Sequence, residues 1–180
     1  MVLGALTIPM NVFFINRQRT RNINLRRLKL IADALIAHLE VSDAELGVHL
    51  VGVPEMIRLN KTFLHHTGST DVIAFDYADP GGQCFVTAPK VRAKTTRCPP
   101  LHGEIFICVD EAMRAARRFH TGWQSEIVRY LIHGVLHLQG YDDSHPGARR
   151  KMKREEDRRL RALSRQFSLA QLARPAKLPA

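Results

Sequence analysis

The chain has 180 residues, 45% of them hydrophobic, and a formal net charge of +10, which suits one domain over residues 1–180 with its core over about 11–167. No apolar stretch reaches the ~20 residues that span a bilayer, and no positive charges precede the apolar start, so we expect neither a membrane helix nor a signal peptide. Three cysteines without a C-x-x-C pair then indicate reduced thiols in a cytoplasmic protein, although a Cys84–Cys98 pair remains an alternative.

Two strand–helix units are predicted for the first 64 residues. Residues 11–16 are apolar and β-prone, and predict a strand. Apolar residues then recur at spacings of three and four from Leu25 to Leu39, which predicts an amphipathic helix capped by Asn24. Residues 46–53 alternate in part and predict a second strand. Pro54 favours the first turn of a helix that runs to about Leu64, and we expect its apolar stripe to consist of Met56, Ile57, Leu59 and Phe63.

A second pair of strands is predicted further along the chain. Residues 70–75 and 103–109 are β-branched and apolar. Between them, residues 78–102 contain four of the nine prolines, so we expect a long, partly mobile loop or a hairpin. Asp110 is placed to cap a helix over residues 111–119.

Residues 127–138 predict a buried helix, because they are nearly all apolar and only Arg129 is charged. His133 and His137 stand four residues apart, so their side chains lie on one face of that helix. Such a pair often has a purely structural role. Gly134 between them has a low helix propensity, which indicates that space is needed beside the histidines.

The segment after this helix can complete a metal site. Gly140 suits a left-handed helix cap, and the chain can then return with Asp142 or Asp143 beside the two imidazoles. Two nitrogens and one carboxylate form a three-ligand set with room for a water, as in catalytic zinc sites. A zincin-type protease is not expected, because glycine replaces the glutamate of its H-E-x-x-H motif.

Residues 133–142, HGVLHLQGYD, resemble the H-G-x-L-H-L-x-G-Y-D motif of the YbeY family of bacterial endoribonucleases and rRNA maturation factors. The segments 70–75 and 103–109 resemble two further family segments in the same order, so the resemblance covers about residues 11–165. Most family members have a third histidine where this chain has Asp143. Many also have an arginine at the position of Leu64, which this chain lacks.

The resemblance implies a metal site made of His133, His137 and Asp143 that holds one Zn²⁺. Asp142 matches the family aspartate that lies beside the ligands. His145 is the alternative third ligand, or a fourth ligand in a purely structural site. The residue that moves protons stays open among Glu104, Asp71 and His66.

Residues 147–167 predict a last helix, followed by a frayed tail over 168–180. The narrow apolar stripe of this helix consists of Met152, Leu160, Leu163 and Phe167, and the other faces of the helix are mostly basic.

Positive charge is concentrated at both ends of the chain, with six basic and no acidic residues in 1–30 and a net charge of +8 in 145–180. Such blocks suit a phosphate backbone, and the candidate RNA-binding residues are Arg149, Arg150, Lys151, Lys153 and Arg154.

The predicted order β-α-β-α-β-β-α-α-α indicates an α+β (mixed α/β) fold, a small mixed sheet packed with helices. By resemblance, the metal site lies on a central helix packed against that sheet. The resemblance also implies a zinc-dependent, single-strand-specific endoribonuclease of rRNA maturation and ribosome biogenesis. Its expected partners are an rRNA precursor, small-subunit ribosomal proteins and an Era-type GTPase, with no membrane. Two alternatives remain: a non-catalytic assembly factor with a structural metal, and a metal-dependent hydrolase of a small molecule.

Overall fold

The computed structural model describes residues 10–39, 41, 43–78 and 100–174. The expectations for the chain start, for most of the loop over 78–102, for the Cys84–Cys98 pair and for residues 175–180 lie outside these residues.

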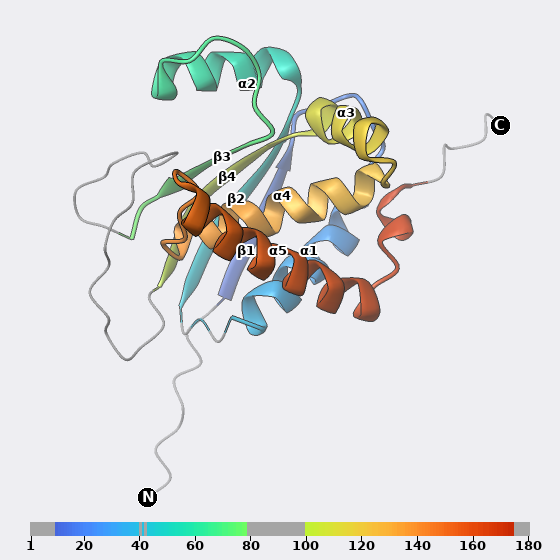
Figure 1. The fold of residues 1–180 in the computed structure, drawn as a ribbon. Helices are drawn as coiled ribbons and strands as arrows, with labels where there is room; N and C mark the ends of the chain where they lie inside the picture. The colour runs from blue at the N-terminus through green and yellow to red at the C-terminus, as the bar shows by residue number, and fades with distance from the viewer. Residues whose placement is uncertain (1–9, 40, 42, 79–99, 175–180) are drawn as a thin grey trace, which may run out of the picture.

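A four-stranded mixed sheet forms the middle of the fold (Figure 1). Its strands are β1 (Met10–Asn16), β2 (Ala44–Val51), β3 (Val72–Asp76) and β4 (Leu101–Cys108), in the order β1-β2-β4-β3. β1, β2 and β4 are parallel, and β3 runs antiparallel to β4. Both the α+β class and the predicted order of strands and helices are confirmed.

Alternating side chains of the strands give the sheet two different faces. Leu46, Val48 and Leu50 belong to the main core, together with residues of α1 (Leu25–Ala37), α4 (Trp123–Leu138) and α5 (Pro146–Gln166). We call this side the α4 face. On the other side, which we call the α2 face, a smaller core includes Met56 and Phe106 and packs under α2 (Val53–Leu59) and η1 (Asn60–Leu64).

The predicted helix starts were right at Asn24 and wrong at Asp110. The Asn24 side chain accepts a hydrogen bond from the Arg27 N–H and caps α1. α3 (Val109–Phe119) begins one residue before Asp110, which therefore cannot be its cap. The Asp110 carboxylate instead accepts hydrogen bonds from the Val53 N–H and the Thr20 hydroxyl, and so joins three segments of the chain.

Two expectations about burial were also wrong. The segment 53–64 is an α-helix that continues as a single π-turn, η1. Within the predicted apolar stripe, Met56 is fully buried, whereas Ile57 and Phe63 are 37% and 48% exposed. Residues 168–174 are not a frayed tail. They form the 3-10 helix η2 (Leu169–Leu172), Leu172 is fully buried, and the Asn24 N–H donates to its carbonyl oxygen.

Gly134 is required by the sheet and not by the histidines. A Cβ at this position would lie 2.7 Å from Cγ2 of Ile105 in β4, so the glycine lets α4 pack closely on the sheet, contrary to the prediction. Gly103 has a similar role, since a Cβ there would collide with the Phe75 carbonyl oxygen and crowd Leu138.

The strand β4 begins at Leu101, two residues earlier than predicted. No helix in the described ranges is long and apolar enough to cross a membrane.

Candidate metal centre

The two histidines lie on the side of α4 that faces α5 and the loop after α4. The other sides of α4 are buried, with Ile127, Leu131 and Val135 in the main core. α4 therefore cannot rotate about its axis without exposing apolar surface, at about 25 cal/mol per Å². The core thus fixes the direction in which the imidazoles of His133 and His137 point.

A tight helix end returns the chain to the histidines. Gly140 adopts a left-handed conformation, with φ of 84°, as predicted. Its N–H donates to the His137 carbonyl, and the Tyr141 N–H donates to the Leu136 carbonyl. This pair of hydrogen bonds is a Schellman motif, which ends the helix and reverses the chain. Asp143, two residues after Tyr141, then lies beside the imidazole rings of His133 and His137.

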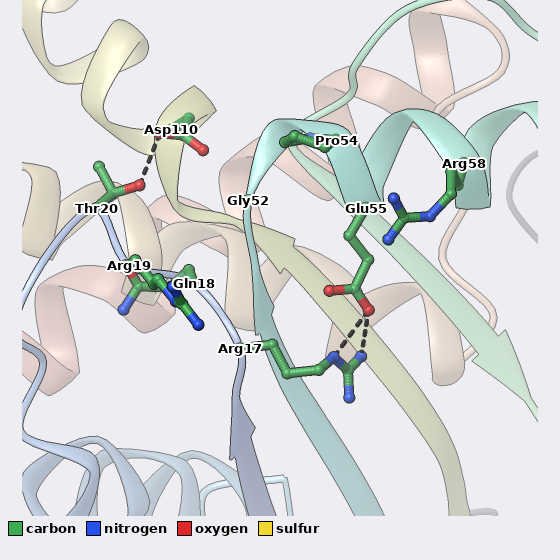
Figure 2. Close-up of a pocket in the computed structure, with 9 residues that line it drawn as sticks. All are labelled: Arg17, Gln18, Arg19, Thr20, Gly52, Pro54, Glu55, Arg58 and Asp110. Atoms are coloured by element: carbon green, nitrogen blue, oxygen red, sulfur yellow. Dashed lines mark hydrogen bonds and ion pairs between the residues drawn. The ribbon is translucent and has the colours of Figure 1, made fainter.

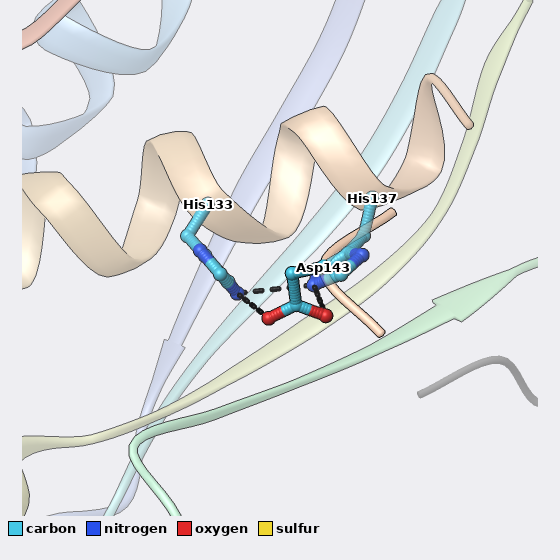
Figure 3. Close-up of side chains that lie close together, drawn as sticks. All are labelled: His133, His137 and Asp143. Atoms are coloured by element: carbon cyan, nitrogen blue, oxygen red, sulfur yellow. Dashed lines mark hydrogen bonds and ion pairs between the residues drawn. The ribbon is translucent and has the colours of Figure 1, made fainter. Parts of the chain in front are cut away.

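Three side chains converge on one small space (Figure 3). The Nε2 atoms of His133 and His137 are 3.0 Å apart, and each lies 3.9 Å from a carboxylate oxygen of Asp143. One ligand atom from each residue lies within 4.8 Å of the other two, so one metal ion could contact all three. We call these residues the His–His–Asp group.

The far side of each imidazole is held by a hydrogen-bond acceptor. His133 Nδ1 lies 3.2 Å from a carboxylate oxygen of Glu156, and His137 Nδ1 lies 3.1 Å from the Tyr141 carbonyl oxygen. Because an ionised carboxylate and a carbonyl can only accept, these contacts assign the proton of each ring to Nδ1. Metal-binding histidines are oriented in this way.

This assignment leaves two nitrogen lone pairs facing each other across 3.0 Å. Two such lone pairs repel unless a cation or an additional proton lies between them. Burial, and next the neighbouring His133, lower the pKa of His137, so an additional proton is disfavoured. The donor chemistry of the group therefore fits a metal ion.

Glu156 on α5 is the member of the site that sequence reasoning missed. Its side chain is 7% exposed, and its second oxygen accepts from Arg129 (2.6 Å) and Lys153 (2.9 Å). Burial alone would raise the pKa of Glu156, but the hydrogen bonds from His133, Arg129 and Lys153 outweigh it and hold the pKa at about 2. The available signal was its position in the apolar stripe of α5, four residues from both Met152 and Leu160.

The two alternative ligands lie outside the group. Asp142 accepts hydrogen bonds from the N–H and the hydroxyl of Ser144, which lower its pKa. His145 is 67% exposed and is paired with Asp142 at 3.3 Å. Of the three candidates, the structure brings only Asp143 to the histidines, and its role as a metal ligand stays a prediction.

The proposed proton carriers are not gathered around the group. Glu104 projects from the α2 face, where it contacts His49 (3.0 Å) and the Tyr77 hydroxyl (2.9 Å), with the sheet between it and α4. The Asp71 carboxylate accepts from the Thr70 hydroxyl and the Val72 N–H. His66 is exposed beyond η1. We therefore assign none of them to the chemistry.

The five basic residues predicted to bind RNA have different surroundings on α5. The Arg149 Nε–H donates to the Asp143 carbonyl (3.1 Å), and Lys153 pairs with Glu156, so both support the metal group. The Lys151 ammonium lies 5.6 Å from the centre of the Tyr141 ring. Arg150 and Arg154 are exposed, with no hydrogen bond or ion pair to any residue of the described ranges.

Comparisons with known proteins identify relatives for most of the chain. The family profile described as Endoribonuclease YbeY matches residues 10–164. Proteins named Endoribonuclease YbeY are 36% identical over 137 residues in Anaeromyxobacter sp. (76% of this chain, 64% of the relative) and 38% identical over 108 residues in Chlorobium luteolum (60% and 66%). A third, from Salinibacter ruber, is 29% identical over 144 residues (80% and 86%).

The match to the first relatives is partial in length, since the chain covers less than two thirds of the Anaeromyxobacter and Chlorobium proteins. A solved structure agrees with the fold: the solution structure of TM1509 from Thermotoga maritima aligns with a TM-score of 0.56 and 20% identity. The alignment covers 88% of this chain and 92% of that protein.

Proposed function

The chain belongs to the YbeY family, and on that premise we propose that it is a zinc-dependent endoribonuclease that cuts single-stranded RNA during rRNA maturation. The observation that carries this proposal is the His–His–Asp group, in which both Nε2 atoms face one carboxylate while both Nδ1 atoms are already engaged.

His133, His137 and Asp143 would hold the metal ion through two nitrogens and one oxygen. Three protein ligands leave a position for water, as in catalytic zinc sites, whereas structural sites usually have four. A zinc ion held there would supply Lewis-acid chemistry for the activation of water towards a phosphodiester. In the protein, Glu156 and the Tyr141 carbonyl keep the two rings in orientation.

The RNA strand would be positioned by basic residues next to this group. Arg150 and Arg154 project from the first half of α5, the helix that also carries Glu156. Contacts of this kind neutralise backbone phosphates and carry little base specificity, so binding would weaken steeply with salt.

The biological context is proposed from the family alone. We propose an rRNA precursor as substrate, small-subunit ribosomal proteins and an Era-type GTPase as partners, and the cytoplasm as location. The names of the relatives support the RNA substrate.

Metal analysis coupled to a cleavage assay tests the function. The purified protein should contain about one zinc per chain, and it should cut a single-stranded rRNA fragment in a way that chelator abolishes and zinc restores. His137→Ala should lose both the zinc and the cleavage. His145→Ala is the matched control, because this exposed histidine is turned towards Asp142. Equal zinc content in wild type and His137→Ala would contradict the proposed site.

One observation favours a second candidate function, a non-catalytic assembly factor. Leu64, where many family members have an arginine, packs against the smaller core of the α2 face. A protein that binds zinc and RNA tightly but leaves the RNA uncut in every metal condition would have this function.

A further inference from the structure

A pocket lies away from the His–His–Asp group, beyond the carboxyl ends of β1 and β2 (Figure 2). It has a volume of about 510 Å³, which is within the ~300–1,000 Å³ that small-molecule sites occupy. Its walls are the loop over residues 17–20, the start of α2 from Gly52 onwards, and Asp110 of α3.

The topology of the sheet opens this pocket. β1 and β2 are parallel neighbours, but the helix after β1 packs on the α4 face and the helix after β2 packs on the α2 face. The two connections therefore diverge, and they leave a crevice beyond the strand ends. In open sheets with parallel strands, ligands bind at such switch points.

Side-chain hydrogen bonds fix the walls of the pocket. Gln18 is 7% exposed, and its amide bonds to the Asn16 side chain and to both the N–H and the carbonyl of Arg21, which fixes the loop after β1. Asp110 ties this loop to the start of α2 through Thr20 (2.8 Å) and the Val53 N–H (3.0 Å). The walls are thus positioned before any ligand arrives.

The charges of the pocket favour an anion. Three arginines and two carboxylates line it. The carboxylate of Asp110 already accepts hydrogen bonds from the Thr20 hydroxyl and the Val53 N–H. Arg17 is held by Glu55 (2.7 Å) and by His49 (3.2 Å). Arg19 and Arg58 are exposed at the pocket, and neither has an ion pair or hydrogen bond with any residue that the structure describes.

The pocket is separate from the metal group. The end of α4, just after His137, packs over Gly103 near the amino end of β4, whereas Asp110 follows the carboxyl end of the same strand. The five steps from Gly103 to Cys108 correspond to roughly 16 Å of strand. A ligand in this pocket would not touch the metal ligands.

We infer that this pocket binds a phosphate group, with Arg19 and Arg58 as the ligand-facing guanidinium groups and Arg17 as a fixed neighbour. The planar fork of arginine matches the oxygens of phosphate, which explains the preference for this anion. The phosphate comes from the RNA strand, a statement that rests on the proposed function. A free nucleotide has the same chemistry and is tested as a separate source.

The double variant Arg19→Gln/Arg58→Gln tests the inference, with Arg26→Gln/Arg117→Gln as the matched control. Both variants remove two positive charges from exposed helix or loop positions, but only the first pair lines the pocket. A labelled single-stranded RNA 12-mer is titrated in chelator over a series of salt concentrations, and adenosine 5′-monophosphate is titrated separately with NMR detection of the arginine Nε–H groups. Thermal melting verifies that both variants are folded.

For the RNA, we expect the pocket variant to bind several-fold more weakly at low salt, with the slope of log affinity against log salt reduced by about 0.7 for each phosphate that is no longer neutralised. The control should keep the wild-type slope. Equal losses in both variants, or none in either, would overturn RNA as the source. If RNA fails to bind the wild type while the nucleotide perturbs Arg19 and Arg58, the phosphate pocket stands and the proposed function fails. If neither ligand depends on the two arginines, the inference is wrong.

Discussion

At the residue scale, Glu156 of α5 connects the candidate metal ligand His133 of α4 to neighbouring basic side chains. One of its oxygens holds His133, and the other is held by Arg129 and Lys153. Carboxylates in this position set the tautomer of a ligating histidine and raise its basicity. The proposed metal affinity therefore depends on a residue that contributes no ligand atom.

Glu156→Gln should weaken zinc binding by about tenfold to a hundredfold, the usual cost of losing such a partner. The neutral amide holds His133 without the negative charge that strengthens the ring as a donor. Competition with a zinc chelator measures the change. Glu155→Gln is the control, since Glu155 pairs with Arg158 and Arg159 on the same helix. An unchanged zinc affinity in Glu156→Gln would show that the carboxylate does not support the site.

Asp143→His should retain zinc, because an imidazole nitrogen and a carboxylate oxygen reach the metal at similar distances. Asp143→Ala should lose much of the affinity, since only two nitrogens remain. Mass spectrometry of the native proteins gives the zinc content of each. If Asp143→Ala keeps its zinc and His145→Ala loses it, the third ligand is His145.

At the element scale, α4 combines two requirements that oppose each other. It must lie close enough to β4 for glycine to be needed at position 134, and it must also present two imidazoles on its other side. Gly134 meets the first requirement at a helix-propensity cost of about 1 kcal/mol relative to alanine. The position of the histidines thus depends on the contact between α4 and the sheet.

Gly134→Ala should destabilise the protein by about 1–3 kcal/mol, because the added methyl group overlaps Ile105 and overpacks the core. Helix propensity alone predicts the opposite sign, so the experiment separates the two effects. The midpoint of denaturant unfolding measures the change. Gly147→Ala in the first turn of α5 is the control, since the nearest atom to a Cβ there is 3.9 Å away. A Gly134→Ala variant as stable as wild type would mean that β4 adjusts at little cost.

Replacing Arg150 and Arg154 of α5 by glutamine should weaken RNA binding and reduce its salt dependence, while zinc affinity stays unchanged. These two arginines contact no metal-site residue in the described structure, whereas Arg149 and Lys153 do. The slope of log affinity against log salt is the measurement, and it should fall by about 0.7 for each phosphate that the variant leaves without a cationic partner. An unchanged slope would identify the two arginines as solvated surface residues.

At the scale of the whole molecule, the proposed metal site joins segments that pack on one core. α4, the loop after it and α5 contribute the ligands and their partners. Since the unfolded chain does not hold the three ligands in this geometry, zinc should bind the folded state preferentially and stabilise it.

Zinc at about 100 times its dissociation constant should therefore stabilise the apo protein by about 2.7 kcal/mol. For a chain of this size, that corresponds to a rise in melting temperature of roughly 5–10 °C. Differential scanning calorimetry with and without the metal checks it. His137→Ala should show no comparable rise, and a rise as large as that of wild type would mean that zinc stabilises the protein elsewhere.

Local patterns in the sequence determined much of this protein. Spacings of three and four predicted α1, a nearly continuous apolar run predicted the buried helix α4, and apolar, β-branched or partly alternating segments predicted the strands, because burial selects the pattern of the apolar residues. The spacing of His133 and His137 put both rings on one helix face, and Gly140 ended the helix where a left-handed residue was needed. The family resemblance rested on these same residues.

Only the tertiary structure decided which distant groups meet. Glu156 reaches His133 because α5 packs on α4, and Gly134 is needed because α4 packs on Ile105. Asp110 binds Thr20 and Val53 instead of capping its own helix, and Glu104 lies across the sheet from the metal group. No local pattern encodes these outcomes, because each depends on the direction in which one element packs on another.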